Sequence, residues 1–175
     1  MQSFSEIDTI SKRASKAAGF AWGIAEEIGK NMRNLEMFGL PGIKNLNLYL
    51  KKIKKNPAEK PKKIEKKNKP RSKEFCPIYC GTAFLDNCKK LETLKLIKFF
   101  NVSYPLLFLP FLSRASDIVG KKLLIKYEKN IFLLNFDKTI FSNNINNNKI
   151  VTKAKEISIE FLRNNNLFSH KEWKE

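Results

Sequence analysis

A lysine-rich segment divides the chain into two parts with different sequence patterns. Residues 51–74 read KKIKKNPAEKPKKIEKKNKPRSKE and hold 12 basic residues against 3 Glu, a net charge of +9. Three prolines interrupt the segment, and its repetitive polar composition offers few side chains for a hydrophobic core. We therefore predict a disordered linker over residues 51–74, between a helical head at residues 1–50 and an α+β lobe at residues 75–175.

The head carries two stretches of helical periodicity, each closed by glycine. Ser3 and Glu6 have the spacing of a capping box, which predicts a helix over residues 5–18 that ends before Gly19. A second pattern predicts a helix over residues 21–38, and a shorter third helix follows at residues 43–53. Small residues recur on both long helices, so we expect them to pack closely as an antiparallel hairpin. These small residues are Ala14, Ala17 and Ala18 on the first helix and Ala21, Ala25 and Gly29 on the second.

The lobe changes to the alternating period of β-strands. Residues 123–127 and 131–136 predict a hairpin around a polar turn, with its second strand central in the sheet, and residues 155–162 predict a third strand. Residues 91–102 satisfy the periods of both a helix and a strand, and both interpretations stay open. Further expectations are a short helix at 113–119, a loop at 142–148, and a turn at GTAFLD from which Asp86 caps a helix. The predicted class is α+β: an N-terminal helical hairpin plus a small, mainly antiparallel β-sheet lobe.

One face of the second predicted helix combines an aromatic residue with charges. Trp22, Glu26 and Arg33 fall together at helical spacing, and Glu27 lies beside them. Because an exposed tryptophan is unfavourable, we predict that the α+β lobe covers Trp22, so that Glu26, Glu27 and Arg33 line a seam between head and lobe. With Asp86 they are our candidate ligand-binding residues. The alternative is an ordinary solvated helix face on which Trp22 packs locally.

The sequence lacks the residues that several classes of function require. The chain has one histidine, His170, and neither phosphate-binding glycine loops nor a nucleophile-elbow motif. Cys76, Cys80 and Cys88 lack a nearby fourth ligand, so we expect reduced, partly buried thiols and neither a metal nor a cofactor. The start of the chain leads into no apolar run, and the longest apolar stretch is interrupted by prolines. We therefore expect a cytoplasmic protein without a transmembrane helix.

The sequence also resembles a known family. The resemblance rests on RASKAAGFAWGIAEEIGKNMRNLEMFGLPG at residues 13–42, CPIYCGTAFLDN at 76–87 and PLLFLPFLSRAS at 105–116. The positions that carry the pattern are Arg13, Ala14, Gly19, Trp22, Gly23, Ala25, Glu26, Glu27, Gly39, Pro77, Asp86, Pro105 and Pro110. On these residues the chain is similar to an uncharacterised bacterial family, domain of unknown function 3726, although Asn34 stands where a second tryptophan is expected. The resemblance implies one shared domain, interrupted by the lysine-rich linker, and implies no activity.

Three hypotheses of function remain. The first is an accessory or ligand-binding protein, for a small molecule or a protein partner, with its site between head and lobe. The second is a nucleic-acid-associated protein that uses the lysine-rich linker, which the net charge of +17 favours. Only 5 of the 34 basic residues are Arg, the better reader of bases and phosphates, which weakens that hypothesis. The third is an enzyme whose acid–base chemistry comes from Glu26, Glu27 and Asp86. The oligomeric state is not predicted.

Overall fold

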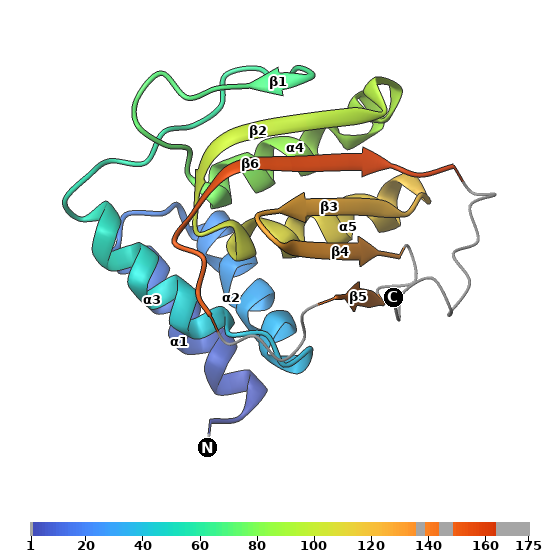
Figure 1. The fold of residues 1–175 in the computed structure, drawn as a ribbon. Helices are drawn as coiled ribbons and strands as arrows, with labels where there is room; N and C mark the ends of the chain where they lie inside the picture. The colour runs from blue at the N-terminus through green and yellow to red at the C-terminus, as the bar shows by residue number, and fades with distance from the viewer. Residues whose placement is uncertain (1, 136–138, 144–148, 164–175) are drawn as a thin grey trace.

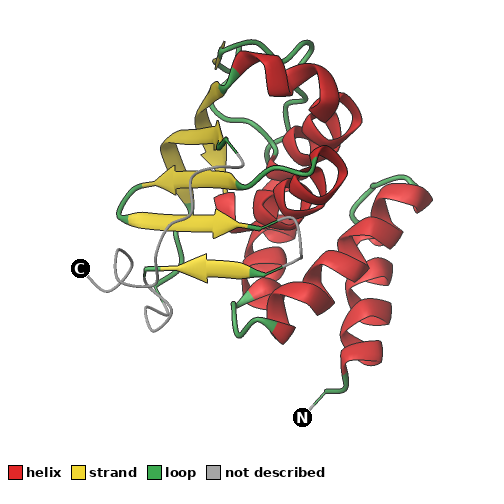
Figure 2. Cartoon of the chain, turned by 90° about the vertical axis from the view of Figure 1, so that its right-hand side faces the viewer, coloured by secondary structure: helices red, strands yellow, loops and turns green. Residues whose placement is uncertain are grey.

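The protein folds into one layer of helices packed on one layer of β-sheet, in agreement with the expected α+β class (Figures 1 and 2). The computed structural model describes residues 2–135, 139–143 and 149–163. Three helices come first, and the C-terminal half then contributes two further helices and most of the sheet. Among the helices in these ranges, none combines the length and the apolarity that a membrane span requires.

The three N-terminal helices form close to the predicted bounds: α1 (Phe4–Ala17), α2 (Trp22–Met37) and α3 (Gly42–Ile53). The capping box is present, since the Ser3 backbone N–H donates to the Glu6 carboxylate at 2.9 Å and the Glu6 N–H donates to the Ser3 hydroxyl at 3.2 Å. Gly19 and Gly39 follow α1 and α2 with φ values of 104° and 76°, a conformation that glycine adopts without strain. Local signals therefore explain where these helices end.

The contact between α1 and α2 uses a different face of α1 from the one expected. Ala14 and Ala17 are exposed, whereas Ile7, Ser11 and Ser15 are buried. Ile7 anchors α1 in the core, and residues four and eight positions later lie on the same helix face, so the two serines are buried with it. On α2 the expectation holds at Ala25 and Gly29, both of which are buried.

The sheet contains six strands in the described ranges, in the order β1-β2-β6-β3-β4-β5. Their bounds are β1 (Lys67–Asn68), β2 (Leu96–Ser103), β3 (Leu123–Tyr127), β4 (Asn130–Leu134), β5 (Ile140–Ser142) and β6 (Lys153–Phe161). The predicted hairpin is β3–β4, the predicted third strand is β6, and the ambiguous segment is β2. All neighbours pair antiparallel except β1 and β2, which are parallel.

Two details of the C-terminal half correct the sequence interpretation. The second strand of the hairpin, β4, is interior because it pairs with both β3 and β5, but the middle of the sheet is occupied by β6 and β3. Asp86 caps no helix: α4 (Pro77–Leu91) begins at Pro77, a favourable first residue, and runs through the expected turn, leaving Asp86 exposed. The short helix α5 (Leu109–Val119) starts four residues earlier than expected. Residues 144–148 of the expected loop lie outside the described residues.

Residues 51–74, for which we predicted a linker, contain the end of α3 and the strand β1. The first of these residues complete α3, and β1 extends the sheet beside β2. Two side chains bond the intervening backbone to itself: the Glu59 carboxylate accepts from the N–H groups of Arg71 and Ser72, each at 2.7 Å, and Asn68 exchanges hydrogen bonds with Glu65. Ile64 is buried. The division of the chain into head, linker and lobe stays a prediction.

Helices α4 and α5 cover one face of the sheet (Figure 1), and the core continues from there into the three N-terminal helices. Phenylalanine rings from distant segments meet there. Phe84 of α4 stacks on Phe161 of β6 with ring centres 6.0 Å apart, and Phe99 of β2 meets Phe108 edge-on at 5.2 Å. These contacts join elements of the C-terminal half that lie far apart in the sequence.

Candidate functional site

Trp22 is not covered by the C-terminal half. Its side chain is 54% exposed, and the ammonium groups of Lys12 and Lys16 lie 5.7 and 5.9 Å from the ring centre. Both lysines belong to α1. They lie close to Trp22 because Trp22 is the first residue of α2 and follows shortly after the end of α1. The predicted covering of Trp22 is therefore wrong, and the alternative of local packing describes its surroundings.

The other four candidate residues have separate surroundings. Glu27 forms an ion pair with Arg114 of α5, so it does contact the C-terminal half, whereas Arg33 pairs with Asp8 of α1 at 3.7 Å. The remaining two, Glu26 and Asp86, are exposed on α2 and α4. None of the candidate residues lines the pocket described below. The structure does not gather them into one site, and a binding role for them stays a prediction.

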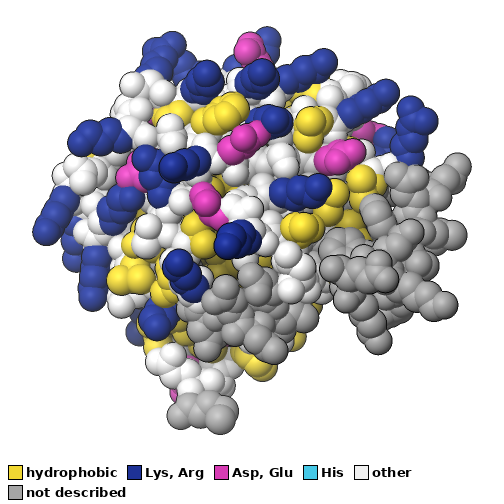
Figure 3. Space-filling model, viewed as in Figure 1, with side chains coloured by type: hydrophobic (Ala, Val, Ile, Leu, Met, Phe, Trp, Pro, Cys, Tyr) yellow, Lys and Arg dark blue, Asp and Glu magenta, His cyan; other side chains and the backbone are white. Residues whose placement is uncertain are grey.

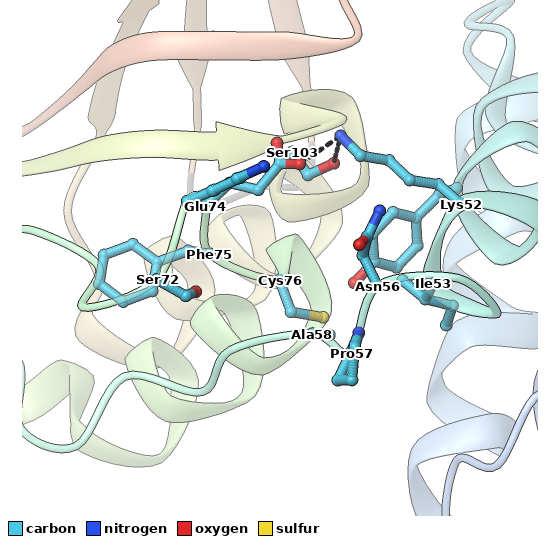
Figure 4. A pocket seen from close by; sticks show the side chains of 12 residues that line it. Lys52, Ile53, Asn56, Pro57, Ala58, Ser72, Glu74, Phe75, Cys76 and Ser103 are labelled. Carbon is cyan, nitrogen blue, oxygen red and sulfur yellow. Dashed lines mark hydrogen bonds and ion pairs between the residues drawn. The ribbon is translucent and has the colours of Figure 1, made fainter.

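A pocket of about 230 Å³ lies elsewhere on the boundary between the N-terminal helices and the C-terminal half (Figure 4). One wall comes from the last turns of α3, another from residues 56–58, and a third from residues 72–76 and the end of β2. Its volume is slightly below the range of about 300–1,000 Å³ typical of sites for drug-sized ligands, which suits a smaller molecule.

Backbone hydrogen bonds fix the wall formed by residues 72–76. The N–H of Phe75 donates to the carbonyl of Asn101 at 2.8 Å, and the carbonyl of Phe75 accepts from Ser103 at 3.1 Å. The N–H of Cys76 donates to the carbonyl of Glu59 at 3.0 Å, which ties the wall to the lysine-rich segment. The side chains at these positions are consequently held by the sheet and not by a free loop.

Three polar side chains meet at the rim of the pocket, each from a different element (Figure 4). The Lys52 ammonium of α3 lies 2.5 Å from one oxygen of the Glu74 carboxylate and donates to the Ser103 hydroxyl at 3.2 Å. The second oxygen of Glu74, Oε2, is buried and has no hydrogen-bond partner among the described residues. A carboxylate oxygen in that position is an unused acceptor.

Tyr49 supplies a second buried polar atom without a nitrogen or oxygen partner. Its side chain is 1% exposed and lines the pocket, and its hydroxyl has no nitrogen or oxygen partner within the described ranges, with the Cys76 thiol as a weak partner. Burial, followed by the neighbouring Cys76 thiol, raises the pKa of Tyr49 far above its usual value, so the hydroxyl stays protonated. A thiol is a weak hydrogen-bond partner, and the Tyr49 hydroxyl can still donate to a ligand.

The thiols near the pocket are poor nucleophiles. Burial raises the pKa of Cys76 to about 11 and raises the pKa of Cys80 well above its usual value. Cys76, Cys80 and Cys88 are all free and buried. In the described part of the chain, no group of three or more His, Cys, Asp or Glu residues is placed to hold a metal ion. The pocket thus offers hydrogen bonds and charge, and its thiol is protonated at neutral pH.

Sequence reasoning missed the residues of this pocket for an identifiable reason. Tyr49 lies in a helical pattern, Lys52 and Glu74 lie in a segment rich in such charges, and Ser103 ends a strand more than 50 positions after Tyr49. No motif joins them. Tyr49, Lys52 and Glu74 lie near the ends of the lysine-rich segment, but Ser103 lies far from it in the sequence.

Comparison with known proteins supports a relationship over the N-terminal part. Residues 2–79 match the family model described as protein of unknown function (DUF3726), a range that includes Tyr49, Lys52, Glu74 and Cys76 but not Ser103. No curated protein and no solved structure matches the chain. The resemblance inferred from the sequence is confirmed over residues 2–79, where the chain is similar to this family of unknown function.

Proposed function

We propose that the protein binds a small polar molecule in the pocket between α3 and residues 72–76. The observation that carries the proposal is that two residues lining one pocket have buried polar atoms without a nitrogen or oxygen partner, the Tyr49 hydroxyl and Glu74 Oε2. Leaving a buried donor or acceptor unsatisfied costs about 1–3 kcal/mol, so two such atoms at one pocket favour a ligand that satisfies both.

The pocket chemistry limits the class of ligand. Glu74 Oε2 accepts hydrogen bonds, which requires a hydroxyl or amino group on the ligand, whereas the Tyr49 hydroxyl donates to a ligand oxygen. Ile53, Pro57 and Phe75 provide an apolar wall. A compact molecule with both donor and acceptor groups, such as an amino alcohol, a polyol or an amino acid, meets these requirements.

Thermal unfolding in the presence of such compounds tests the proposal. A panel of amino alcohols, polyols and amino acids is screened for compounds that raise the melting temperature, and dissociation constants are measured by calorimetry. The Tyr49→Phe variant keeps the ring and removes only the hydroxyl. Because one hydrogen bond contributes about 0.5–1.5 kcal/mol, we expect Tyr49→Phe to weaken binding of a stabilising compound roughly 2- to 10-fold.

The matched control is Tyr127→Phe, which removes the hydroxyl of another buried tyrosine, on β3 and outside the pocket. This control should bind the compound as the wild type does. Without ligand, Tyr49→Phe should be at least as stable as the wild type, since it removes an unsatisfied buried hydroxyl. A panel that leaves the melting temperature unchanged, or equal weakening in both variants, would contradict the proposal.

A further inference from the structure

The lysine-rich segment forms a basic hollow of about 600 Å³ beside the pocket. We use the name basic hollow for the concave surface lined by residues 57–63, 65, 67–69, 71, 72 and 75. Six cationic side chains line it: Lys60, Lys62, Lys63, Lys67, Lys69 and Arg71. The acidic residues of its lining are Glu59 and Glu65, so cations predominate. Figure 3 shows Lys and Arg side chains along the upper and left margins of the molecule, where Figure 1 places this segment and β1.

One of the two carboxylates is already engaged by the protein. Glu59 accepts hydrogen bonds from two backbone N–H groups and from the Ser72 hydroxyl. Partial burial raises the pKa of Glu59, but these hydrogen bonds and the charge of Arg71 outweigh it and lower the pKa below its usual value. Glu59 therefore stays ionised, and with Glu65 it offsets two of the six cationic charges, which leaves the lining with a net charge of +4.

The backbone that carries the lysines is fixed at several points. Asn68 donates to the carbonyls of Glu65 at 2.7 Å and of Lys98 at 3.0 Å, which ties β1 to β2. The ammonium of Lys60 lies 4.3 Å from the centre of the Tyr79 ring, and Ile64 is buried. Like charges held close together on a fixed backbone repel one another, and a polyanion relieves that repulsion.

We propose that the basic hollow binds the phosphate groups of a nucleic-acid strand without reading its sequence. Lysines act as point charges towards phosphate, and Arg71 is the one arginine of the lining. An anionic membrane is the less suitable partner, because residues 57–75 contain none of the large exposed hydrophobic side chains found in the described ranges. This proposal does not rest on the proposed pocket ligand, although the two surfaces share Pro57, Ala58, Ser72 and Phe75.

The test measures the anisotropy of a fluorescent oligothymidylate over a series of salt concentrations. The variant Lys62→Gln, Lys63→Gln, Lys67→Gln removes three exposed charges from the basic hollow and spares the residues that fix its backbone. Each phosphate contact with a single strand contributes about 0.7 to the slope of log K against log salt, so we expect this slope to fall by about 2. The affinity at low salt should fall roughly 10-fold or more.

A charge-matched control distinguishes binding at the basic hollow from attraction by the overall positive charge of the protein. The variant Lys126→Gln, Lys129→Gln, Lys155→Gln removes three exposed charges near the β3–β4 turn and β6 and should bind almost as the wild type does. Replacing Lys62, Lys63 and Lys67 by Arg should preserve binding and its salt dependence. Equal losses in the two Gln variants would overturn the proposal. Absence of oligonucleotide binding by the wild type would also overturn it, whether or not anionic vesicles are bound.

Discussion

Helix α1 packs closely on α2 at Gly29, and the variant Gly29→Ala tests this packing. A Cβ atom at this position would lie 2.5 Å from Asp8 Oδ1 and 2.7 Å from the Asp8 backbone carbonyl oxygen. The Asp8 side chain can rotate away, but its carbonyl belongs to the backbone of α1. The helices must therefore separate by about 0.7 Å before the 2.7 Å contact reaches 3.4 Å, where ordinary van der Waals contact begins.

Two effects of opposite sign decide the stability of Gly29→Ala. Alanine is favoured over glycine inside a helix by about 0.8–1.0 kcal/mol. Overpacking a close contact costs about 1–3 kcal/mol, and a clash with backbone belongs near the upper end of that range. We expect a net loss of about 1–2 kcal/mol in the free energy of unfolding. For a chain of this size, such a loss lowers the melting temperature by roughly 2–8 °C.

Gly23→Ala is the matched control, because it makes the same substitution in the same helix. No atom lies within 4 Å of the Cβ position at Gly23, so only the helix preference and the reduced freedom of the unfolded chain act there. We expect Gly23→Ala to stabilise the protein by up to about 1 kcal/mol. Thermal unfolding followed by circular dichroism measures both variants. If Gly29→Ala were as stable as Gly23→Ala, the close packing of α1 on α2 would be refuted.

Two further predictions concern the core and the lysine-rich segment. Phe84 is 0% exposed and stacks on Phe161, so Phe84→Ala should lower the free energy of unfolding by about 3–5 kcal/mol in denaturant titrations. The control is Phe141→Ala, which removes an exposed ring and should lower the free energy of unfolding by less than about 1 kcal/mol. Comparable losses in the two variants would contradict the described core. Because the pKa of Glu59 is lowered in the folded state, its contribution to stability is present above the usual value of 4.5 and is lost as the pH falls through the folded pKa. Glu59→Gln should thus be less stable than the wild type at pH 7, and the difference in melting temperature should shrink at acidic pH; a difference that grows on acidification would show the sign to be wrong.

The sequence indicated most individual elements because their signals are local. The capping box at Ser3 and Glu6, the glycines at the helix ends and the alternation in residues 123–127 act within a few positions of one another. The predicted faces were less accurate. A run of alanines suggested the contact face of α1, but Ile7 set the rotation of that helix and placed the serines there.

The candidate site shows more clearly that sequence patterns do not reveal which distant residues come into contact. The interpretation of Trp22 assumed that an apolar surface must be covered by the distant half of the chain, but lysines of the adjacent helix lie over the ring and leave it half exposed. Glu27 does reach the C-terminal half, through Arg114. The pocket formed at another part of the same boundary, from Tyr49, Glu74 and Ser103, which no spacing rule connects.

The sequence by itself determined the α+β class, the three N-terminal helices and the β3–β4 hairpin, because helix caps, glycine turns and apolar periodicity depend on neighbouring residues alone. Only the tertiary structure decided that β6 enters between β2 and β3, that Trp22 stays exposed, and that Tyr49 and Glu74, each with a buried polar atom, line one pocket. These features depend on which surfaces, far apart in the chain, come together when the core is buried. A local pattern specifies that a face is buried, but it does not specify what that face will contact.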